Sequence, residues 1–241
     1  MNSLISRTSL HLALGAIVAV PMTAFAAGAS KSEVRTTVVT VPVPVNNERV
    51  LLADSFDNYD PHWRQVRGQW ALVGGNLLQA RDEARELNTM MFNDSVNVAD
   101  AEITTEVSIL HDLPQIIVAG DDDLLTTKRR VAGAGLVFRY QDERNFYMFR
   151  TAGEEGVVLG KVVNGEWHEL ANPRAVDFAG VLLKSDTPYR LRVRIVGNRI
   201  QAWIGDKAVA NVEDDSLGTG RVGLATFRSK AAFTALRIVE R

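Results

Sequence analysis

The feature that most constrains the fold is a strict alternation of apolar and polar residues over residues 189–195. The apolar positions share one face of a strand, and the opposite face carries Arg190, Arg192 and Arg194. Because side chains alternate between the two faces of a β-strand, this pattern predicts a half-buried strand and not a helix. Gly197-Asn198 then supplies a tight turn, and residues 200–204 alternate again. The sequence therefore predicts a β-hairpin over residues 189–204.

The same period of two recurs along most of the chain from about residue 50 onward. Residues 135–140 and 146–151 flank a polar turn at 141–145, which predicts a second hairpin. Further short strands are predicted at residues 69–73, 77–80, 101–110, 157–163, 168–171, 222–226 and 233–239. No segment sustains a helical period of 3.6 residues. Many short strands joined by hairpin turns, without crossover helices, predict an all-β antiparallel sandwich or barrel.

The amino end has the pattern of an export signal. Arg7 is followed by an apolar run over residues 12–20 and then by small residues that end at Ala26. The run is too short for a comfortable membrane span, and no later stretch is long and apolar enough, so we expect no membrane span. We predict a signal peptide over residues 1–26, and cleavage after Ala24 is the alternative.

A proline-rich stretch follows the predicted cleavage site. Val41-Pro42-Val43-Pro44-Val45 favours extended backbone and removes hydrogen-bond donors from any sheet ladder. We predict an extended spacer over residues 27–49 and one domain over residues 50–241. A short signal on an exported chain without cysteine favours a bacterial protein, either periplasmic or secreted.

Composition excludes several classes of function. The chain has 27 Lys+Arg against 29 Asp+Glu, so it lacks the positive field that a nucleic-acid partner requires. It has no cysteine, which excludes thiol nucleophiles, disulfides and cysteine-ligated metals. The histidines of the mature chain are scattered, and no Gly-x-Ser-x-Gly motif occurs, so a serine triad or a histidine zinc site has no local support.

Several strings occur in the order typical of one superfamily. They are Asp54-Ser55-Phe56-Asp57, Trp63, residues 68–77, residues 135–140 with 145–150, the hairpin at 189–204, and residues 220–226. Together they resemble the concanavalin A-like and laminin G-like jelly-roll domains, over about residues 50–241. The resemblance implies an antiparallel two-sheet jelly-roll sandwich. The superfamily includes lectins, carbohydrate-binding modules, glycoside hydrolases of the laminarinase and 3-keto-disaccharide hydrolase types, and adhesive modules, so the fold does not decide the function.

The outward residues of the hairpin at 189–204 form a candidate binding platform: Trp203, Arg192, Arg194, Arg190 and Gln201. An aromatic ring can stack on a sugar while guanidinium groups donate to hydroxyls or carboxylates. The resemblance implies that this face is the concave sheet surface on which ligands lie. Arg139 and Tyr147 would extend the platform if the second hairpin is symmetric about Glu143, whereas a one-residue slip would bury them. The alternative is a solvated arginine face on which Trp203 packs.

The predicted strand at residues 101–110 carries part of a hydrolase motif. Laminarinase-type enzymes carry Glu-x-Asp-x-Glu, and Glu102 and Glu106 have the spacing of its two glutamates. Thr104 stands at the position of the aspartate, and alternating glutamates are typical of the solvent side of a strand. We therefore expect no catalytic residues.

Calcium is the cofactor that the sequence leaves open. Asp121-Asp122-Asp123 offers hard oxygen ligands, but Lys128-Arg129-Arg130 follows and neutralises that charge. In many members of the resembled superfamily calcium lies between the first and last strands. Asp54 and Asp57 match the first part, but residues 233–236 lack the second carboxylate. We expect no cofactor and no metal ligands, with calcium as the alternative.

These features predict an exported, non-catalytic module that binds carbohydrate or a similarly polar polymer at the bacterial envelope. One alternative is a glycoside hydrolase of the 3-keto-disaccharide hydrolase type. The other is an adhesive or scaffold domain that contacts an envelope protein.

Overall fold

The computed structural model describes residues 48–80, 89–110, 133–180 and 183–241. The predicted signal peptide, nearly all of the predicted spacer, and Asp121-Asp122-Asp123 lie outside these residues. Within the described part, no helix has the length and apolar character needed to cross a membrane.

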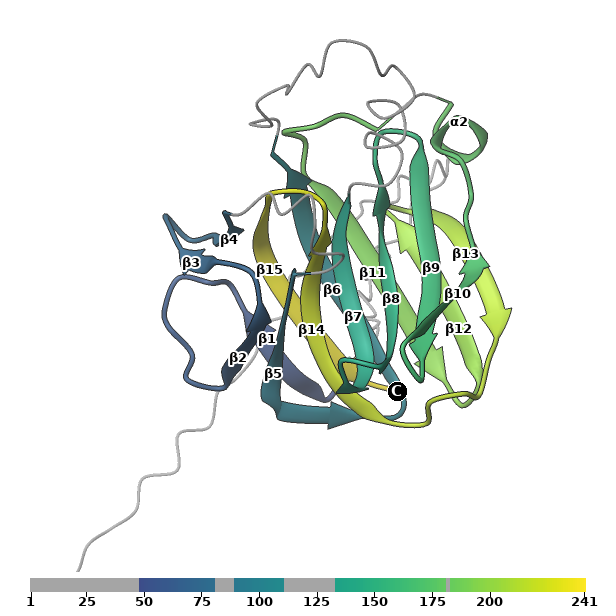
Figure 1. Cartoon of the computed structure of the whole chain (residues 1–241), viewed down its shortest axis with the longest axis horizontal. Helices are drawn as coiled ribbons and strands as arrows, with labels where there is room; N and C mark the ends of the chain where they lie inside the picture. Colours follow the sequence, from purple (N-terminus) through teal and green to yellow (C-terminus); the bar gives the residue numbers. More distant parts are fainter. Residues whose placement is uncertain (1–47, 81–88, 111–132, 181–182) are drawn as a thin grey trace, which may run out of the picture. The chain divides into compact units, whose positions relative to one another are not determined.

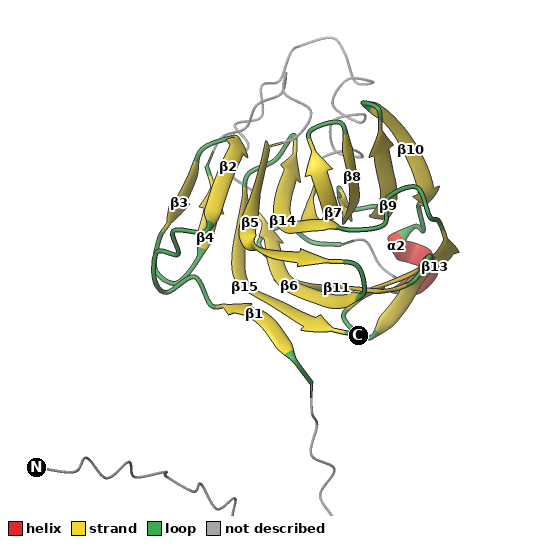
Figure 2. Ribbon diagram, turned by 90° about the horizontal axis from the view of Figure 1, so that it is seen from below, coloured by secondary structure: helices red, strands yellow, loops and turns green. Residues whose placement is uncertain are grey.

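The described strands form two antiparallel sheets that pack face to face (Figures 1 and 2). Sheet A runs in the order β13 (Lys207–Glu213), β12 (Arg199–Ile204), β11 (Tyr189–Val196), β6 (Ala101–Ile109), β15 (Ala231–Glu240), β4 (Leu77–Gln79) and β3 (Trp70–Leu72), and β1 (Val50–Asp54) also pairs with β15. Sheet B runs in the order β10 (Glu166–Ala171), β9 (Gly156–Val163), β8 (Asn145–Ala152), β7 (Gly133–Asp142), β14 (Gly220–Phe227), β5 (Thr89–Val98) and β2 (Trp63–Arg67). A four-residue helix, α2 (Ala175–Phe178), follows β10.

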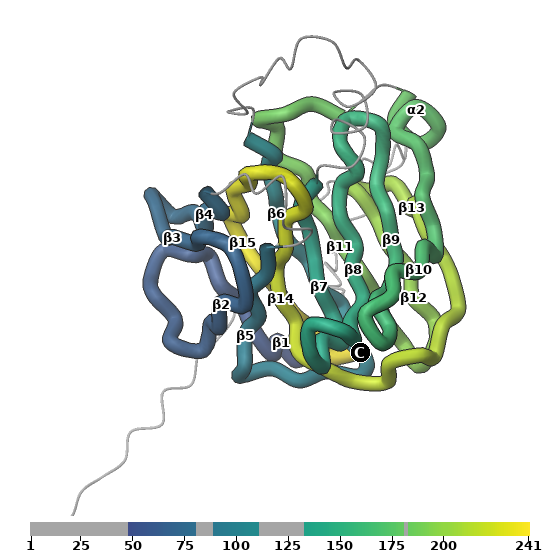
Figure 3. The backbone as a smooth tube through the Cα atoms, in the orientation of Figure 1, coloured from purple at the N-terminus to yellow at the C-terminus, as the bar shows by residue number. Residues whose placement is uncertain are grey.

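The connections identify the architecture. Successive strands from β4 to β7, and again from β13 to β15, lie in alternate sheets, and Figure 3 traces these strands in chain order by colour. The sheets do not close into a barrel, so the fold is a jelly-roll sandwich. The predicted all-β fold is therefore confirmed.

The hairpin at 189–204 is also confirmed. Strands β11 and β12 pair with Arg192 opposite Trp203 and Arg194 opposite Gln201. Gly197, in the turn, has a φ of 59°, a left-handed conformation that glycine adopts without strain. The alternate apolar side chains of both strands are buried between the sheets, as the period of two requires.

The two sheets differ in their outer faces. The main core fills the space between the sheets, with Ile103 and Leu191 from sheet A and Phe138 and Phe149 from sheet B. A second buried apolar cluster lies on the other face of sheet B and contains Met90, Val137, Tyr140, Phe146, Met148, Val162 and Ala225. Central strands of sheet B are therefore apolar on both faces, whereas an antiparallel sheet commonly has one solvated face.

The register of the second hairpin differs from the predicted one. Phe138, and not Arg139, lies opposite Tyr147, because the pairing shifts at Arg139, whose φ is 45°. Arg139 and Tyr147 lie on sheet B and are 2% and 0% exposed. The prediction that they extend the platform on β11 and β12 is wrong, since both side chains are buried and belong to the other sheet.

Tyr147 belongs to a buried polar cluster that fixes the connection between β13 and β14. Its hydroxyl donates to the Asp214 carboxylate at 2.5 Å, and Lys161 Nζ donates to the same carboxylate at 2.5 Å. Burial raises the pKa of Asp214, but the hydrogen bonds from Lys161, Tyr147 and Ser216 outweigh it and lower that pKa to about 2. The cluster therefore stabilises the fold while Asp214 is ionised.

Acid is expected to remove this stabilisation. The folded-state pKa of Asp214 lies below the ordinary value of 3.8, so its contribution is present above about pH 4 and is lost as the pH falls toward about 2. Urea unfolding of the wild-type chain and of Asp214→Asn across this range measures the effect. The difference between their free energies of unfolding should shrink as the pH falls, and a difference that stays constant would contradict the assignment.

Candidate functional site: an aromatic pocket on sheet B

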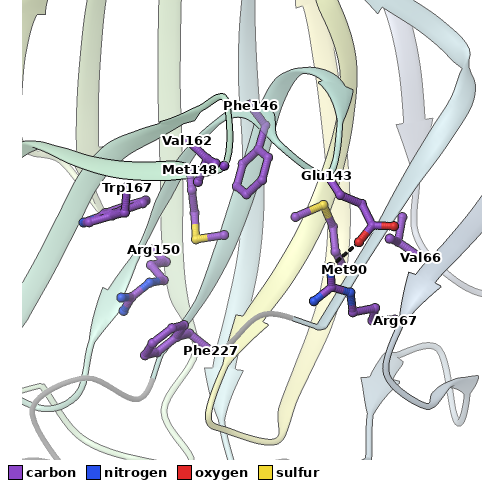
Figure 4. Close-up of a pocket in the computed structure, with 11 residues that line it drawn as sticks. Val66, Arg67, Met90, Glu143, Phe146, Met148, Arg150, Val162, Trp167 and Phe227 are labelled. Atoms are coloured by element: carbon purple, nitrogen blue, oxygen red, sulfur yellow. Dashed lines mark hydrogen bonds and ion pairs between the residues drawn. The ribbon is translucent and has the colours of Figure 1, made fainter. Parts of the chain in front are cut away.

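Two adjoining cavities lie on the outer face of sheet B, and they share Arg150, Trp167 and Phe227. The first has a volume of about 430 Å³ and is also lined by Met90, Phe146 and Met148 (Figure 4). The second has a volume of about 750 Å³ and is also lined by Glu155, Glu169 and Arg174. We call the two cavities together the Trp167 pocket. Both volumes lie within the range typical of small-molecule sites.

Trp167 is the exposed aromatic residue of this pocket. The turn at Asn164 and Gly165, both with positive φ, places Trp167 on β10 opposite Val162 on β9. Gly160 lies beneath the indole, and any side chain there would collide with the ring atoms Cζ2 and Cη2. The indole therefore rests on the backbone of β9 and remains 42% exposed.

The floor of the first cavity is apolar. Phe146 and Met148 project outward from β8, and Val162 projects outward from β9. These three residues alternate with Tyr147, Phe149 and Leu159, which face the main core. An apolar floor beside an exposed indole is suited to a flat ligand with C–H groups on its face.

Charged groups line the same pocket. The Arg150 side chain is almost wholly buried, and its Nη1 donates to the carbonyl of Thr151 at 2.9 Å. Its guanidinium carbon lies 4.5 Å from the centroid of the Phe227 ring. At the other end of the first cavity, Arg67 forms an ion pair with Glu143, which joins the end of β2 to the turn between β7 and β8 (Figure 4).

The predicted platform lies elsewhere on the molecule. Trp203, Arg190, Arg192, Arg194 and Gln201 do lie together, but on the outer face of sheet A. The Arg192 guanidinium carbon lies 4.2 Å from the centroid of the Trp203 ring, and Arg190 Nη2 donates to Asp206 at 2.9 Å. The platform and the Trp167 pocket are therefore on opposite sides of the sandwich.

The other candidate acidic residues have structural partners. Glu102 forms an ion pair with Arg241 at 3.2 Å, and Glu106 accepts a hydrogen bond from Thr234 Oγ1 at 3.3 Å. The Asp54 carboxylate accepts hydrogen bonds from the backbone nitrogen of Phe56 and from Trp63 Nε1, each at 2.8 Å. These bonds hold the connection between β1 and β2. Among the residues that the structure describes, no group of three His, Cys, Asp or Glu side chains is arranged to hold a metal ion.

Sequence patterns did not point to Trp167, Arg150 or Phe227. The usable signal was the Asn164-Gly165 turn, because a two-residue turn pairs Trp167 with Val162 and brings Gly160 beneath the ring. A tryptophan on an edge strand beside a glycine is a surface ring with a free approach from solvent.

Comparison with solved structures finds similar folds. The carbohydrate-binding module CBM66 from Bacillus subtilis has a TM-score of 0.57 and 20% identity, over 72% of this chain and 92% of that one. The β-glucanase of Bacillus licheniformis has a TM-score of 0.54 and 9% identity, over 79% of this chain and 98% of that one. The laminarinase from Rhodothermus marinus has a TM-score of 0.54 and 8% identity, over 80% of this chain and 97% of that one.

At these identities the similarity shows the fold alone, and this fold is the jelly-roll sandwich that the resemblance implied. No family model and no curated protein matches the chain.

Proposed function

We propose that the chain is a carbohydrate-binding module and that the Trp167 pocket holds the glycan. The observation that carries this proposal is the exposed indole of Trp167, set beside an apolar floor and the Arg150 guanidinium. A sugar ring presents C–H groups on its faces and hydroxyls at its rim, so stacking and hydrogen bonding act on it together. The structural neighbours support the proposal, since they include a carbohydrate-binding module, a β-glucanase and a laminarinase.

Binding without catalysis is favoured by the state of the carboxylate in the first cavity. A typical glycoside hydrolase uses two carboxyl groups that flank the scissile bond, about 5 to 9.5 Å apart. Glu143, the carboxylate among the described residues that line this cavity, is engaged in its ion pair with Arg67. It therefore serves to hold the turn between β7 and β8.

A hydrolase is the second candidate, because two carboxylates line the second cavity. Glu155 and Glu169 both border it, and Asn172 Nδ2 donates to Glu169 at 3.1 Å. If this pair were catalytic, Glu169→Gln would abolish the release of reducing ends and leave polysaccharide binding intact.

A panel of polysaccharides tests the proposed function. In native gels that contain each polysaccharide, at least one is expected to retard the purified domain, and the same mixtures should release no reducing ends. Release of reducing ends would establish the hydrolase. Failure of every polysaccharide to retard the domain, with an envelope protein co-purifying, would establish the scaffold.

We also propose that the chain is exported and acts in the periplasm or outside the cell. The support is the sequence pattern of residues 1–26. Amino-terminal sequencing of the mature chain is expected to begin at Ala27. A chain that retains Met1 and stays in the cytoplasm would contradict export.

A further inference from the structure

Two arginine side chains converge on one aromatic ring beside the Trp167 pocket. The guanidinium carbon of Arg150, from β8, lies 4.5 Å from the centroid of Phe227, and that of Arg228 lies 5.2 Å from it. Phe227 ends β14 and lines both cavities, and Figure 4 shows its ring beneath Arg150. Two like charges on one ring repel each other, and an anion bound between them would remove that repulsion.

The Nε atoms of both arginines are buried. Arg150 is 8% exposed, and the Nε atom of Arg228 is buried without a hydrogen-bond partner among the described residues. Burial, and then the positive charge of Arg228, lower the pKa of Arg150 to about 10, and the attraction of Glu169 opposes this shift. Arg150 still carries its charge at neutral pH, in an environment that disfavours it.

The backbone holds Arg228 in an unfavourable conformation. Its φ is 51°, in the left-handed region that non-glycine residues seldom adopt. The next residue, Ser229, is buried and donates from Oγ to the carbonyl of Gly133 at 2.8 Å, which fixes the turn between β14 and β15. Strain of this kind persists only where surrounding contacts impose it, and it is concentrated at ligand sites.

We infer that Arg150 and Arg228 bind an anionic group of the glycan, so that the ligand of the Trp167 pocket is an acidic polysaccharide. Planar guanidinium groups pair with carboxylates and with sulfates through parallel hydrogen bonds. Trp167 borders the same cavities as Arg150, so one sugar chain can contact both the indole and the Arg150 guanidinium. Arg228 lies on the Phe227 ring, which lines both cavities. This inference rests on the proposed function and names the ligand class for it.

Two matched pairs of polymers test the inference: polygalacturonate with its carboxyl-reduced form, and dextran sulfate with dextran. At least one acidic polymer is expected to bind at least about tenfold more tightly than its neutral partner, and to lose affinity as salt is added. The pair that shows the difference identifies the anionic group as carboxylate or sulfate.

Charge-removing variants locate the effect. Arg228→Gln is expected to weaken binding of the acidic polymer at least about tenfold, without changing the affinity for the neutral partner. Arg199→Gln is the matched control, since Arg199 lies on the outer face of sheet A and donates from Nε to Asn211 at 2.9 Å. It removes the same charge and should leave binding unchanged. The melting temperature of Arg228→Gln should be equal to or above that of the wild-type chain, because the substitution relieves repulsion.

Three results would overturn the inference. If neutral polymers bind as tightly as acidic ones and lose affinity in Trp167→Ala, the ligand is neutral and the proposed function stands. If Arg228→Gln and Arg199→Gln weaken binding equally, the attraction is a general charge effect. If no polymer of either pair binds and the wider polysaccharide panel also fails, the proposed function fails together with the inference.

Discussion

Replacing Arg139 with methionine is expected to lower the free energy of unfolding by about 3–5 kcal/mol. Its guanidinium donates to the carbonyls of Ala99, Gly197 and Leu217, at distances between 2.7 and 3.2 Å. These carbonyls belong to three separate connections, which join β5 to β6, β11 to β12, and β13 to β14. Methionine fills a similar volume but donates no hydrogen bond, so all three carbonyls lose this partner, and that of Leu217 belongs to a buried residue.

Urea and thermal unfolding measure this effect. For a domain of this size the loss corresponds to a fall in melting temperature of about 6–20 °C. Arg199→Met is the control, because its exposed side chain has one hydrogen-bond partner, and it should change the free energy of unfolding by no more than about 0.5 kcal/mol. Equal unfolding midpoints for the two variants would show that Arg139 does not hold the three connections together.

Trp167→Ala is expected to weaken polysaccharide binding by about ten- to a hundredfold, since stacking and desolvation of the ring contribute about 1–3 kcal/mol. The melting temperature should change little, because the indole is 42% exposed. Gly160→Ala is a second test that keeps the tryptophan. A methyl group at 160 would collide with the ring and displace it, so this variant should also lose affinity.

Trp203→Ala separates the two surfaces. Its ring is partly buried and packs against Arg192 on the outer face of sheet A. We expect a lower melting temperature with unchanged binding. Loss of binding in Trp203→Ala, with Trp167→Ala unaffected, would place the glycan on the platform of β11 and β12.

The sequence was sufficient to predict those strands and turns that are determined by the alternation of side chains and by turn residues. Over residues 189–195 every apolar residue faces the core, and Gly197 permits the turn, so the alternation and the turn predict the same hairpin. Strand β5 was not predicted, because Met90, Met91 and Phe92 are apolar on both faces. The alternation of Val96 and Val98 with polar residues covers only the end of the strand. Strand β13 was missed for a different reason: it is an edge strand with few buried side chains.

The register at Arg139 depends on contacts that local pattern does not contain. The shift exists because the guanidinium reaches carbonyls of three connections that are distant in the sequence. The Trp167 pocket was not predicted for a related reason. The alternation of apolar and polar residues separates inward from outward side chains, but it does not predict which outer face contains a pocket. On sheet B the outer residues are themselves apolar, so Phe146 and Met148 look like core residues in the sequence.

A crystal structure of the domain with an oligosaccharide from the tightest-binding polysaccharide tests the central claim most directly. The account predicts a sugar ring stacked on Trp167 in the pocket on sheet B, with an acidic substituent at Arg150 and Arg228. A sugar seated against Trp203 and Arg192 on the outer face of sheet A, with the Trp167 pocket holding none, would contradict it.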